Sequence, residues 1–561
     1  MTPAKLRAPE EHGGILIEPP PQDWPSIIEA NARQLKEIPL RFCNLPLRHW
    51  RQVAQQQVRG DAQQLLTHWG LSARLPDAPC LVTGHQPELF HPGVWAKHFA
   101  LGEASQILGL APIDLIADHD QPKTLSLRVP TATEQGLAVT WIPFFQFRPG
   151  LAWEEYVLPV PTACSTKGTV PLSACDSQVS PSCALLVHLE RLMQRVQGLI
   201  SNLLPDAIFP QFVADIAEFL SSQTQPFRLA DALAGTRRRW EERWGYRNGE
   251  LYVSCLCNSE VFLAFVAELI GQLPRFLEAH NAELLAFRRE QRLRSRTHPV
   301  PLLERDGEWY EAPLWVWRNE QPRQRLWVRI SPQAWTFRMG ESGPGWQVAP
   351  VLNPDELRGW NEALQAAGWK IRPRAVTLTL FVRLFVADLF IHGIGGGLYD
   401  RFTDRLLWRC WQITPPRYAV VSATLRLPLP YPTKPPWRRE EVLHRLRDCR
   451  YNPDRVLPEE LLSLPEVRSQ IDRKRALLSQ WTQADRQMRC DLHHQLAQIR
   501  AALRPLTGQV EQQCYSALQA VADYQAQMKL VRDRGWAFVF YSERALTELV
   551  ERIRGIYGAL R

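Results

Sequence analysis

The segment between residues 80 and 120 constrains the fold of this chain more than any other. An apolar strand, APCLVTG, is followed by the turn-rich HQPELFHPGV, a helical stretch from Trp95 to Leu108, and a second apolar strand in PIDLIADHD. This order is the βαβ unit of a parallel sheet, and the loop after its first strand leaves at the carboxyl edge, where open α/β sheets bind ligands. We therefore predict an α/β fold built on a parallel sheet.

A second strand, loop and helix are expected late in the chain. The apolar run in RPRAVTLTLFVRLFVADLFIHG reads as a strand, and we expect the following helix to begin near Tyr399. The glycines between them are Gly393, Gly395, Gly396 and Gly397. Short strands between the two α/β elements, including the Trp-rich EAPLWVW and RLWVRI, resemble an insertion rather than a repeat.

The length suggests several folding units. At about 150 residues per domain, 561 residues correspond to three or four units. We expect an N-terminal helical lead-in at 1–75, the first part of the α/β core at 76–240, an inserted connecting region at 241–360, the second part of the core with the glycine-rich loop at 361–428, and a helical coiled-coil domain with the C-terminal tail at 429–561.

The last of these segments shows coiled-coil periodicity. LPYPTKPP, at 429–436, is a stiff linker. Beyond it, apolar residues at spacings of four and three form a seam: Val510, Cys514, Ala517, Val521, Tyr524, Met528 and Val531. An upstream stripe from Ile471 to Leu503 offers a partner, and RPLTGQ supplies the turn between them. We predict an antiparallel hairpin, followed by a short strand in GWAFVFY and a closing helix.

Composition argues against several classes of protein. No run reaches the roughly 18 apolar residues of a membrane span, and no secretory signal opens the chain, so we expect a cytoplasmic protein without a membrane partner. The net charge of +8 comes without a basic stripe, so we expect no nucleic-acid partner. The 11 cysteines form no CxxC pair, and Cys255 and Cys257, on an expected strand, lack further zinc ligands nearby; reduced thiols are the better interpretation.

The first candidate site is the loop after the first strand, with the residues Thr83, Gly84, His85, Gln86, His91 and Gly93. A loop that leads from a strand into a helix presents backbone N–H groups and the positive end of the helix dipole to an anion. His85 and His91 would stabilise the charge on a transferring or leaving phosphate. The alternative is a tight turn whose histidines satisfy backbone carbonyls, and spacing alone does not separate the two.

The second candidate is Asp118, His119 and Asp120, at the end of the second strand. Two carboxylates beside an imidazole could bind a metal ion, orient a ribose or hold the histidine for general-base work. A helix N-cap in a solvated turn is the simpler interpretation of DHD by itself. Its position favours function, because both loops leave neighbouring strands at the same edge.

The third candidate is the glycine loop, with His392, Gly393, Gly395, Gly396 and Gly397, flanked by Asp400. Glycines let a phosphate or carboxylate approach the backbone, and the next helix offers its N-terminus. The loop matches neither a Walker A sequence nor GxGxxG, and close packing of strand and helix is the alternative. For five polar residues beside aromatics, surface ion pairs are the simpler expectation: Arg296, His298, Glu311, Arg372 and Arg374.

These features, in this order, resemble one known family. A TG-x-Q loop followed by LF and a Pro-Gly pair, a strand ending in DHD, a late apolar strand with a glycine-rich loop, and a C-terminal coiled coil are similar to the bacillithiol-biosynthesis cysteine-adding enzyme family. The resemblance implies a Rossmann-like parallel-sheet core with inserted segments and a homodimer formed through the coiled coil. It also implies that cysteine is joined to glucosaminyl-malate, an amino-sugar acceptor, after ATP activates the cysteine carboxylate.

Both loops depart from the family pattern. Where the family has TGQQ and LFTGP, this chain has Thr83-Gly84-His85-Gln86 and Leu89-Phe90-His91-Pro92-Gly93, and HGIGGG replaces a GGPGE-like sequence. Because these loops would contact the substrates, we interpret the chain as a diverged member with another acceptor.

On this interpretation the chain is an ATP-dependent, ligase-like enzyme that acts on small molecules. ATP would lie against residues 83–93, Asp118 and Asp120 would position Mg²⁺ or the ribose, and His119 would accept a proton from the attacking amine. The glycines at 393–397 would hold the amino-acid carboxylate or a phosphate. The sequence leaves two alternatives open: a Rossmann-like nucleotidylyl transferase that releases pyrophosphate without forming an amide, and a non-catalytic coiled-coil scaffold.

Overall fold

The computed structural model describes residues 6–72, 75–158, 181–223, 225–292 and 300–560, without the side chains of 181–185. The chain forms two compact units, which we call the core unit and the helical unit. The core unit contains Met1–Val129, Val139–Leu427 and Arg534–Arg561, and the helical unit contains Pro130–Ala138 and Pro428–Asp533.

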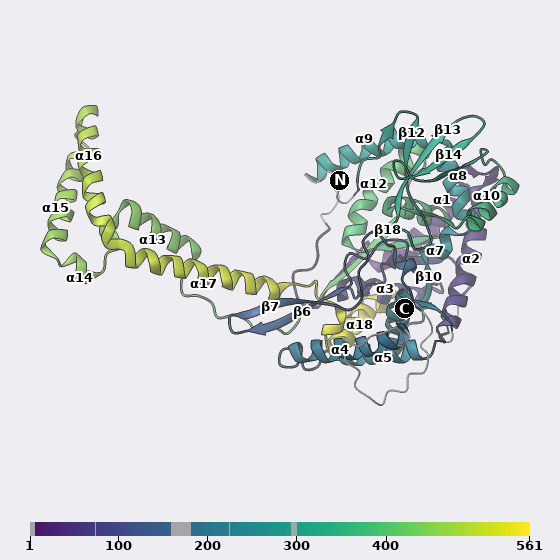
Figure 1. Ribbon diagram of the computed structural model, residues 1–561, viewed down its shortest axis with the longest axis horizontal. Coiled ribbons are helices and arrows are strands. Elements are labelled where there is room, and N and C mark those ends of the chain that lie inside the picture. Colours follow the sequence, from purple (N-terminus) through teal and green to yellow (C-terminus); the bar gives the residue numbers. More distant parts are fainter. Residues whose placement is uncertain (1–5, 73–74, 159–180, 224, 293–299, 561) are drawn as a thin grey trace. The chain divides into compact units, whose positions relative to one another are not determined.

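The core unit is built on a six-stranded sheet with the order β1-β18-β17-β4-β5-β10. Figure 1 labels two of these strands, β18 and β10. Neighbouring strands pair in parallel, except that β1 pairs with β18 in the antiparallel sense. The strands are β1 (Gly14–Glu18), β4 (Cys80–His85), β5 (Ala111–Ile116), β10 (Gly249–Tyr252), β17 (Leu389–His392) and β18 (Tyr418–Thr424). The predicted mixed α/β fold with a parallel sheet is confirmed, and the segments at 76–240 and 361–428 supply strands to the same sheet.

The strand order reverses between β4 and β17. From β4 the sheet continues through β5 to β10 on one side, and from β17 to β18 on the other, so two strands far apart in sequence are neighbours, with Ile391 opposite Thr83. In open α/β sheets, ligands bind outside the carboxyl ends of the strands at such a reversal. The histidine-containing loop after β4 and the glycines after β17 leave the sheet at this position.

Helices cover both faces of this sheet. Val82, Ile113 and Leu115 belong to the hydrophobic core that also includes α2 (Leu47–His68), α11 (Ala375–Phe385) and α12 (Ile394–Trp411). Asp114 points the other way, toward α3 (Pro92–Leu108) and α6 (Leu229–Arg243), which pack on the opposite face. Helix α3 follows β4 and α12 follows β17, so the N-termini of these helices lie on opposite faces of the sheet at its carboxyl edge.

A second, antiparallel sheet has the order β11-β12-β13-β14-β15, and β16 pairs with β12. Its strands are β11 (Arg305–Asp306), β12 (Trp309–Arg318), β13 (Gln324–Ile330), β14 (Trp335–Met339), β15 (Gly345–Val348) and β16 (Trp369–Pro373). Aromatic side chains fill one side, with Phe337 stacked on Trp346 at a centroid distance of 4.6 Å. The short Trp-rich strands expected here are therefore present. The bounds predicted for the inserted region, 241–360, do not match this sheet, because β10 belongs to the core sheet and β16 begins only at Trp369.

The remaining elements of the core unit are mostly helical. Its other helices are α1 (Trp24–Glu37), α4 (Pro181–Ile200), α5 (Phe209–Ser221), α7 (Val253–Cys257), α8 (Glu260–Gly271), α9 (Leu273–Gln291), α10 (Pro354–Ala366) and α18 (Glu543–Tyr557). Its short strand pairs are β2 (Arg41–Phe42) with β3 (Leu45–Pro46) and β8 (Val157–Leu158) with β9 (Phe227–Arg228). A further pair, β6 (Ser126–Thr133) with β7 (Gly136–Pro143), is divided between the units, because Pro130–Ala138 belongs to the helical unit. Among the described helices, none combines the length and the hydropathy that crossing a bilayer requires.

Several local expectations were wrong. The long apolar run is helix α11 followed by the short strand β17, because a fully buried helix is as apolar as a buried strand and only tertiary packing separates them. Helix α12 begins at Ile394 instead of near Tyr399, so three of the four glycines form its first turn. Cys255 and Cys257 lie on helix α7, and Phe538–Phe540 is a 3-10 helix instead of a strand.

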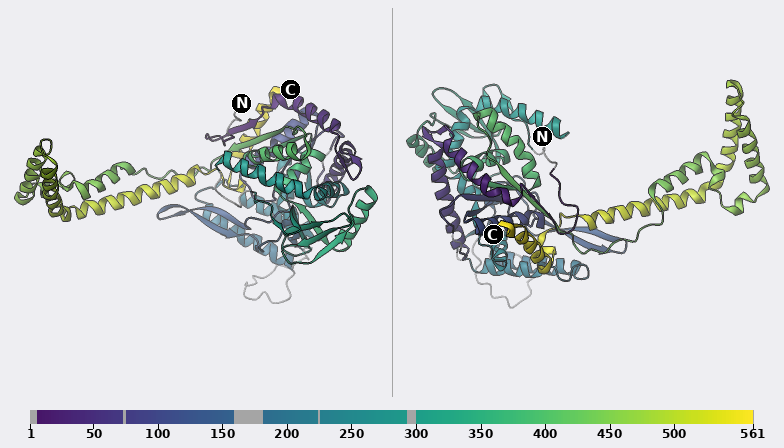
Figure 2. Two further views of the ribbon diagram at one scale, coloured as in Figure 1. Left: turned by 90° about the horizontal axis from the view of Figure 1, so that it is seen from above. Right: turned by 180° about the vertical axis from the view of Figure 1, so that it is seen from behind.

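The helical unit contains five α-helices among its described residues (Figure 2). They are α13 (Arg439–Tyr451), α14 (Glu459–Leu462), α15 (Pro465–Gln480), α16 (Arg486–Leu503) and α17 (Gly508–Arg532). One small core joins α15 to α16 through Val467, Leu477 and Leu492, and a second joins α13 to α17 through Val442, Cys449 and Cys514.

The predicted partner of the C-terminal seam was wrong. Val510 and Cys514, at the start of that seam, pack against α13, whereas the upstream stripe folds into the pair α15 and α16. The cause is the break at Asp485, whose side chain accepts a hydrogen bond from the Met488 amide and so starts α16 as a separate helix. Heptad spacing indicated helices correctly but did not identify which helices pair.

Candidate active site at the carboxyl edge of the sheet

Lys97 of α3 connects the two predicted loops. Its ammonium donates a hydrogen bond of 2.7 Å to the carbonyl oxygen of Gly84, at the end of β4. A Cβ atom on Gly393, at the end of β17, would lie 3.9 Å from the Lys97 Cδ atom. The side chain is buried at the position where the strand order reverses, and this burial lowers the pKa of Lys97 to about 8.

Sequence reasoning missed Lys97. The helix from Trp95 to Leu108 was predicted from its apolar residues, and Lys97 was not among the predicted site residues. The available signal was a Lys-His pair within VWAKHFALG, because lysine is rarely buried without a specific partner.

The residues of β4 itself serve mainly the sheet. The Thr83 hydroxyl, fully buried, donates to the Ile391 carbonyl at 2.8 Å, which ties β4 to β17. A Cβ atom on Gly84 would lie 2.8 Å from the Leu115 carbonyl oxygen, so only glycine allows β5 to approach this closely. Thr83 and Gly84 therefore position the loop.

His85 follows at the start of the loop. Its Nδ1 lies 3.1 Å from the Gln86 carbonyl oxygen, and its ring packs edge-on against Phe90. Burial lowers the pKa of His85 to about 3, so this imidazole is neutral at physiological pH. The Gln86 carbonyl accepts the one N–H of the neutral ring, so His85 offers an anion neither a further N–H nor a positive charge, and Lys97 supplies the charge instead.

His91 and Gly93 begin helix α3. His91 is the N-cap residue, and its Nδ1 accepts a hydrogen bond of 3.0 Å from the Gly93 amide. A Cβ atom on Gly93 would lie 2.3 Å from the Ala423 carbonyl oxygen of β18, so the glycine allows the helix to pack on the sheet. Both residues thus have structural contacts, although His91 caps a backbone amide instead of satisfying a carbonyl, which was the alternative interpretation.

Asp118, after β5, is held by Arg228 of β9 and Ser254 of α7. Its carboxylate accepts hydrogen bonds from the Ser254 amide at 2.9 Å and from Nη1 of Arg228 at 2.6 Å. The side chain is completely buried, and this burial raises the pKa of Asp118 to about 6 even though Arg228 acts in the opposite direction.

His119 and Asp120 complete the DHD segment. Asp120 accepts hydrogen bonds from Gln86 Nε2 at 2.5 Å and from Arg323, which joins the loops after β4 and β5. His119 is 4% exposed, its Nδ1 has no hydrogen-bond partner among the described residues, and burial lowers its pKa to about 4. The structure therefore brings the histidine-containing loop and the DHD segment together, as predicted.

The carboxylates do not fit a protein-held Mg²⁺ site. Guanidinium groups already pair with both of them, Arg228 with Asp118 and Arg323 with Asp120. Mg²⁺ sites in proteins use free carboxylates together with substrate phosphates and water. We therefore derive no step through a metal ion at these residues.

The glycines after β17 form a helix N-terminus. Gly393 is the N-cap of α12, and the first backbone bond of the helix runs from the Gly397 amide to the Gly393 carbonyl, so the three amides before it have no partner within the helix. Gly395 has no atom within 4 Å of an added Cβ, whereas a Cβ on Gly397 would lie 2.4 Å from Val420. Gly395 and Gly396 are exposed, so an anion can approach this turn closely.

The polar residues of the inserted sheet are buried, against expectation. Arg372 forms two hydrogen bonds of 2.9 Å with the carboxylate of Glu154, and Arg374 donates to Glu311 at 2.7 Å. Arg372, Glu154 and Glu311 are all at most 5% exposed. Side chains from another segment provide their partners, which no local pattern indicates. Arg296 and His298 lie outside the described residues.

A second group of buried charged residues lies between the sheet and helices α3 and α6. Potential ligand atoms of His98, Asp114 and Glu250 lie within 4.8 Å of one another, as in a metal site. Arg237 already bridges the group, with Nη2 2.7 Å from Glu250 and 3.3 Å from Asp114. A bridging guanidinium fits a buried ion-pair network better than a metal site. Burial raises the pKa of Glu250 to about 8, against the effect of Arg237.

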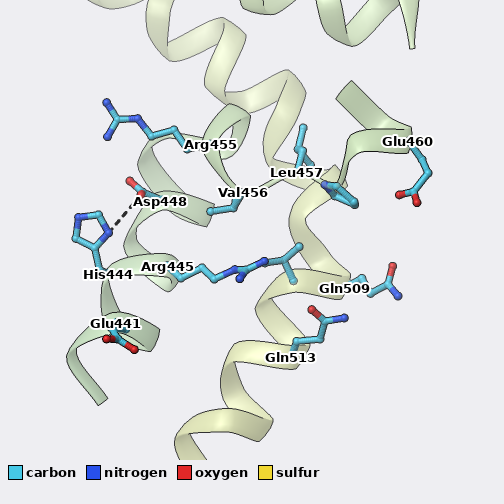
Figure 3. Close-up of a pocket in the computed structure, with 12 residues that line it drawn as sticks. Glu441, His444, Arg445, Asp448, Arg455, Val456, Leu457, Glu460, Gln509 and Gln513 are labelled. Carbon is cyan, nitrogen blue, oxygen red and sulfur yellow. Dashed lines mark ion pairs between the residues drawn. The ribbon is translucent and has the colours of Figure 1, made fainter. Parts of the chain in front are cut away.

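The helical unit has its own groove, of about 530 Å³, between α13 and α17 (Figure 3). His444 points toward Asp448 there, with 3.4 Å between Nδ1 and the carboxylate. None of the residues that line this groove was a predicted site residue, so the candidate site belongs to the core unit.

Comparison with known proteins finds no family model that matches the chain and no curated protein with significant similarity to it.

Proposed function

We propose that the core unit is a Rossmann-like enzyme that binds the phosphates of ATP at the carboxyl edge of its sheet, between β4 and β17. The observation that carries this proposal is the position of Lys97. Its buried side chain lies where the strand order reverses, with the ammonium bonded to the end of β4 and the Cδ atom beside Gly393, the N-cap of α12. A cation and free helix amides at one place are the groups that bind phosphate.

The reaction that we propose is ligase-like amide formation. ATP activates the carboxylate of cysteine or a related amino acid, and the amine of an amino-sugar acceptor then attacks that carbon. Lys97 and the amides of Gly395 and Gly396 hold phosphate oxygens. His119, neutral at pH 7 and with an unpartnered Nδ1, accepts the proton that leaves the attacking amine.

The remaining histidines have supporting roles in this proposal. His85, neutral, holds the start of the loop after β4 through its hydrogen bond to the Gln86 carbonyl. His91 holds the N-terminus of α3 and acts through the position of Lys97. The positive charge at the phosphate site thus comes from Lys97.

We further propose a cytoplasmic homodimer formed through the helical unit. Several large apolar side chains of this unit are exposed, which supports an interface between copies: Tyr431, Trp437, Leu464, Leu478 and Tyr515. Sedimentation of the full-length chain with and without Tyr515→Glu tests the dimer, and a monomer for the unaltered chain would remove it.

Turnover assays test the enzymatic proposal. Purified protein is mixed with ATP, cysteine and an amino-sugar acceptor, and products are followed by mass spectrometry. We expect ATP consumption that depends on both substrates, and its loss in Lys97→Met. Pyrophosphate release without an amide product would indicate a nucleotidylyl transferase instead. No turnover with metabolite pools from a deletion strain would indicate a non-catalytic scaffold.

A further inference from the structure

His392, the last residue of β17, is held by a buried carboxylate. Its Nε2 lies 2.8 Å from Oδ2 of Asp400, two turns along α12, and the two residues are 5% and 1% exposed. Arg383 of α11 donates to the same oxygen at 2.7 Å. Burial would raise the pKa of Asp400, but Arg383 and His392 outweigh it and hold this pKa below its usual value. Asp400 is therefore a carboxylate, and Nε2 of His392 carries a proton that it donates to Asp400.

The other ring nitrogen faces the first turn of α12. A Cβ atom on Gly396 would lie 2.8 Å from Nδ1 of His392. Among the described residues, Nδ1 has no hydrogen-bond partner. Gly396 is exposed, so the amide groups of this turn and the Nδ1 atom are available to the same ligand.

The surroundings of the ring are otherwise defined. The rings of Phe390 and Tyr418 pack against it at centroid distances of 4.3 and 5.1 Å. Among the described residues, charged groups on the packed elements include Arg383, Asp400, Asp404, which Arg383 also binds, Arg401 and, beyond Gly393, Lys97. The titratable neighbours are thus the two aspartates, Tyr418 and Lys97.

We propose that His392 takes up a proton at Nδ1 when a phosphate-type anion binds at the first turn of α12, and that Asp400 is the positioning residue for this histidine. This inference rests on the proposed function and adds to it a proton-carrying ligand for the phosphate. A ring protonated only at Nε2 would present a lone pair at Nδ1, which repels an anion. A proton from solvent forms one N–H bond, and the imidazolium then lies between the Asp400 carboxylate and the anion.

The bound proton has a direct use in the proposed reaction. When the acyl carbon is attacked and the phosphate leaves with the electron pair of its C–O bond, the Nδ1–H can be transferred to the departing oxygen. The imidazole returns to its neutral form, and no oxidant or reductant is needed.

The test is nuclear magnetic resonance of full-length protein labelled selectively in histidine, titrated from pH 5 to pH 9 with and without inorganic sulfate. Sulfate is the probe because it does not itself titrate in this range. His392→Gln identifies the resonances of residue 392. We expect sulfate to raise the titration midpoint of His392 by about one pH unit, which corresponds to about tenfold tighter binding to the protonated form.

Two glycine variants provide a matched pair. Gly396→Ala places a methyl group against Nδ1, whereas Gly395→Ala adds one in open space on the same turn. We expect the sulfate-induced shift to be lost in Gly396→Ala and kept in Gly395→Ala. In Asp400→Asn we expect sulfate still to bind and to shift the His392 titration midpoint less. If Asp400→Asn does not fold, His392→Gln, which removes the titrating ring, is used in its place.

The outcomes separate the inference from the proposed function. The inference would be overturned if sulfate bound to the unaltered protein without changing the His392 titration. If that binding were lost in Lys97→Met, the phosphate site would remain in place. A complete lack of sulfate and ATP binding would remove both.

Discussion

The ammonium of Lys97 donates a hydrogen bond of 2.7 Å to the carbonyl oxygen of Gly84, on one of the two strands between which the strand order reverses. One carbonyl uses only one of the three N–H donors of an ammonium group. The contact therefore orients the side chain and leaves donors for a phosphate, which makes Lys97 the residue on which the account of this site depends.

Lys97→Met is expected to weaken ATP binding at pH 7 by tenfold or more, since a hydrogen bond to a charged group contributes about 1.5–3 kcal/mol. Calorimetric titration measures the affinity, and Lys36→Met, which alters an exposed lysine of α1, is the control. Unchanged affinity together with an unchanged melting temperature would exclude Lys97 from the site.

The affinity for ATP should also depend on pH. Burial lowers the pKa of Lys97 to about 8, so the ammonium loses its proton as the pH rises through this value. We expect affinity to fall between pH 7 and pH 9 in the unaltered protein and to lose most of this dependence in Lys97→Met. The same calorimetric titration at several pH values checks this, and equal slopes for both proteins would contradict it.

His91→Ala should destabilise the core unit by about 1 kcal/mol, because the Gly93 amide at the start of α3 loses its acceptor. His91→Asn should recover most of this, since asparagine also caps helices well. Urea denaturation gives the free energies of unfolding, with exposed His49→Ala as the control. Equal losses in the alanine and asparagine variants would show that the cap is not the cause.

Arg228→Met should destabilise the fold by about 3 kcal/mol, because it leaves the buried Asp118 carboxylate without its cation. The double variant Arg228→Met with Asp118→Asn should recover part of this loss. A double-mutant cycle from urea denaturation measures the coupling, and strictly additive effects would contradict a direct pair.

Glu250→Gln should change how stability depends on pH. Burial raises the pKa of Glu250 in the folded protein to about 8, well above its unfolded value near 4.3. The stabilisation that the protonated Glu250 side chain contributes to the folded state is therefore fully present below pH 4 and is lost as the pH rises through 8. Between pH 5 and pH 9 we expect the free energy of unfolding to decrease as the pH rises, and to decrease less steeply in Glu250→Gln than in the unaltered protein. Unfolding at several pH values measures this, with exposed Glu218→Gln as the control.

The sequence predicted the edge of the sheet well, because its signals there are local. The βαβ pattern from Cys80 to Ile116 and the glycines after His392 identify strand ends, and the ends of parallel strands share one edge. These local patterns were sufficient to predict that the two loops lie close together.

Other parts could not be predicted, because they depend on contacts between segments distant in sequence. The reversal between β4 and β17 is a property of the whole sheet. The role of Lys97 depends on the carbonyl of Gly84 and on Gly393 of a distant segment, and the pairing of Arg372 with Glu154 joins residues 218 positions apart. Helix α11 was mistaken for a strand because burial removes the polar face by which helices are recognised.

A crystal structure with a non-hydrolysable ATP analogue tests the central claim most directly. We expect phosphate oxygens of the analogue within hydrogen-bond distance of Lys97 Nζ and of the backbone amides of Gly395 and Gly396. Phosphates bound elsewhere, for example in the groove lined by His444 and Arg445 of the helical unit, or an unliganded carboxyl edge at saturating analogue, would contradict it.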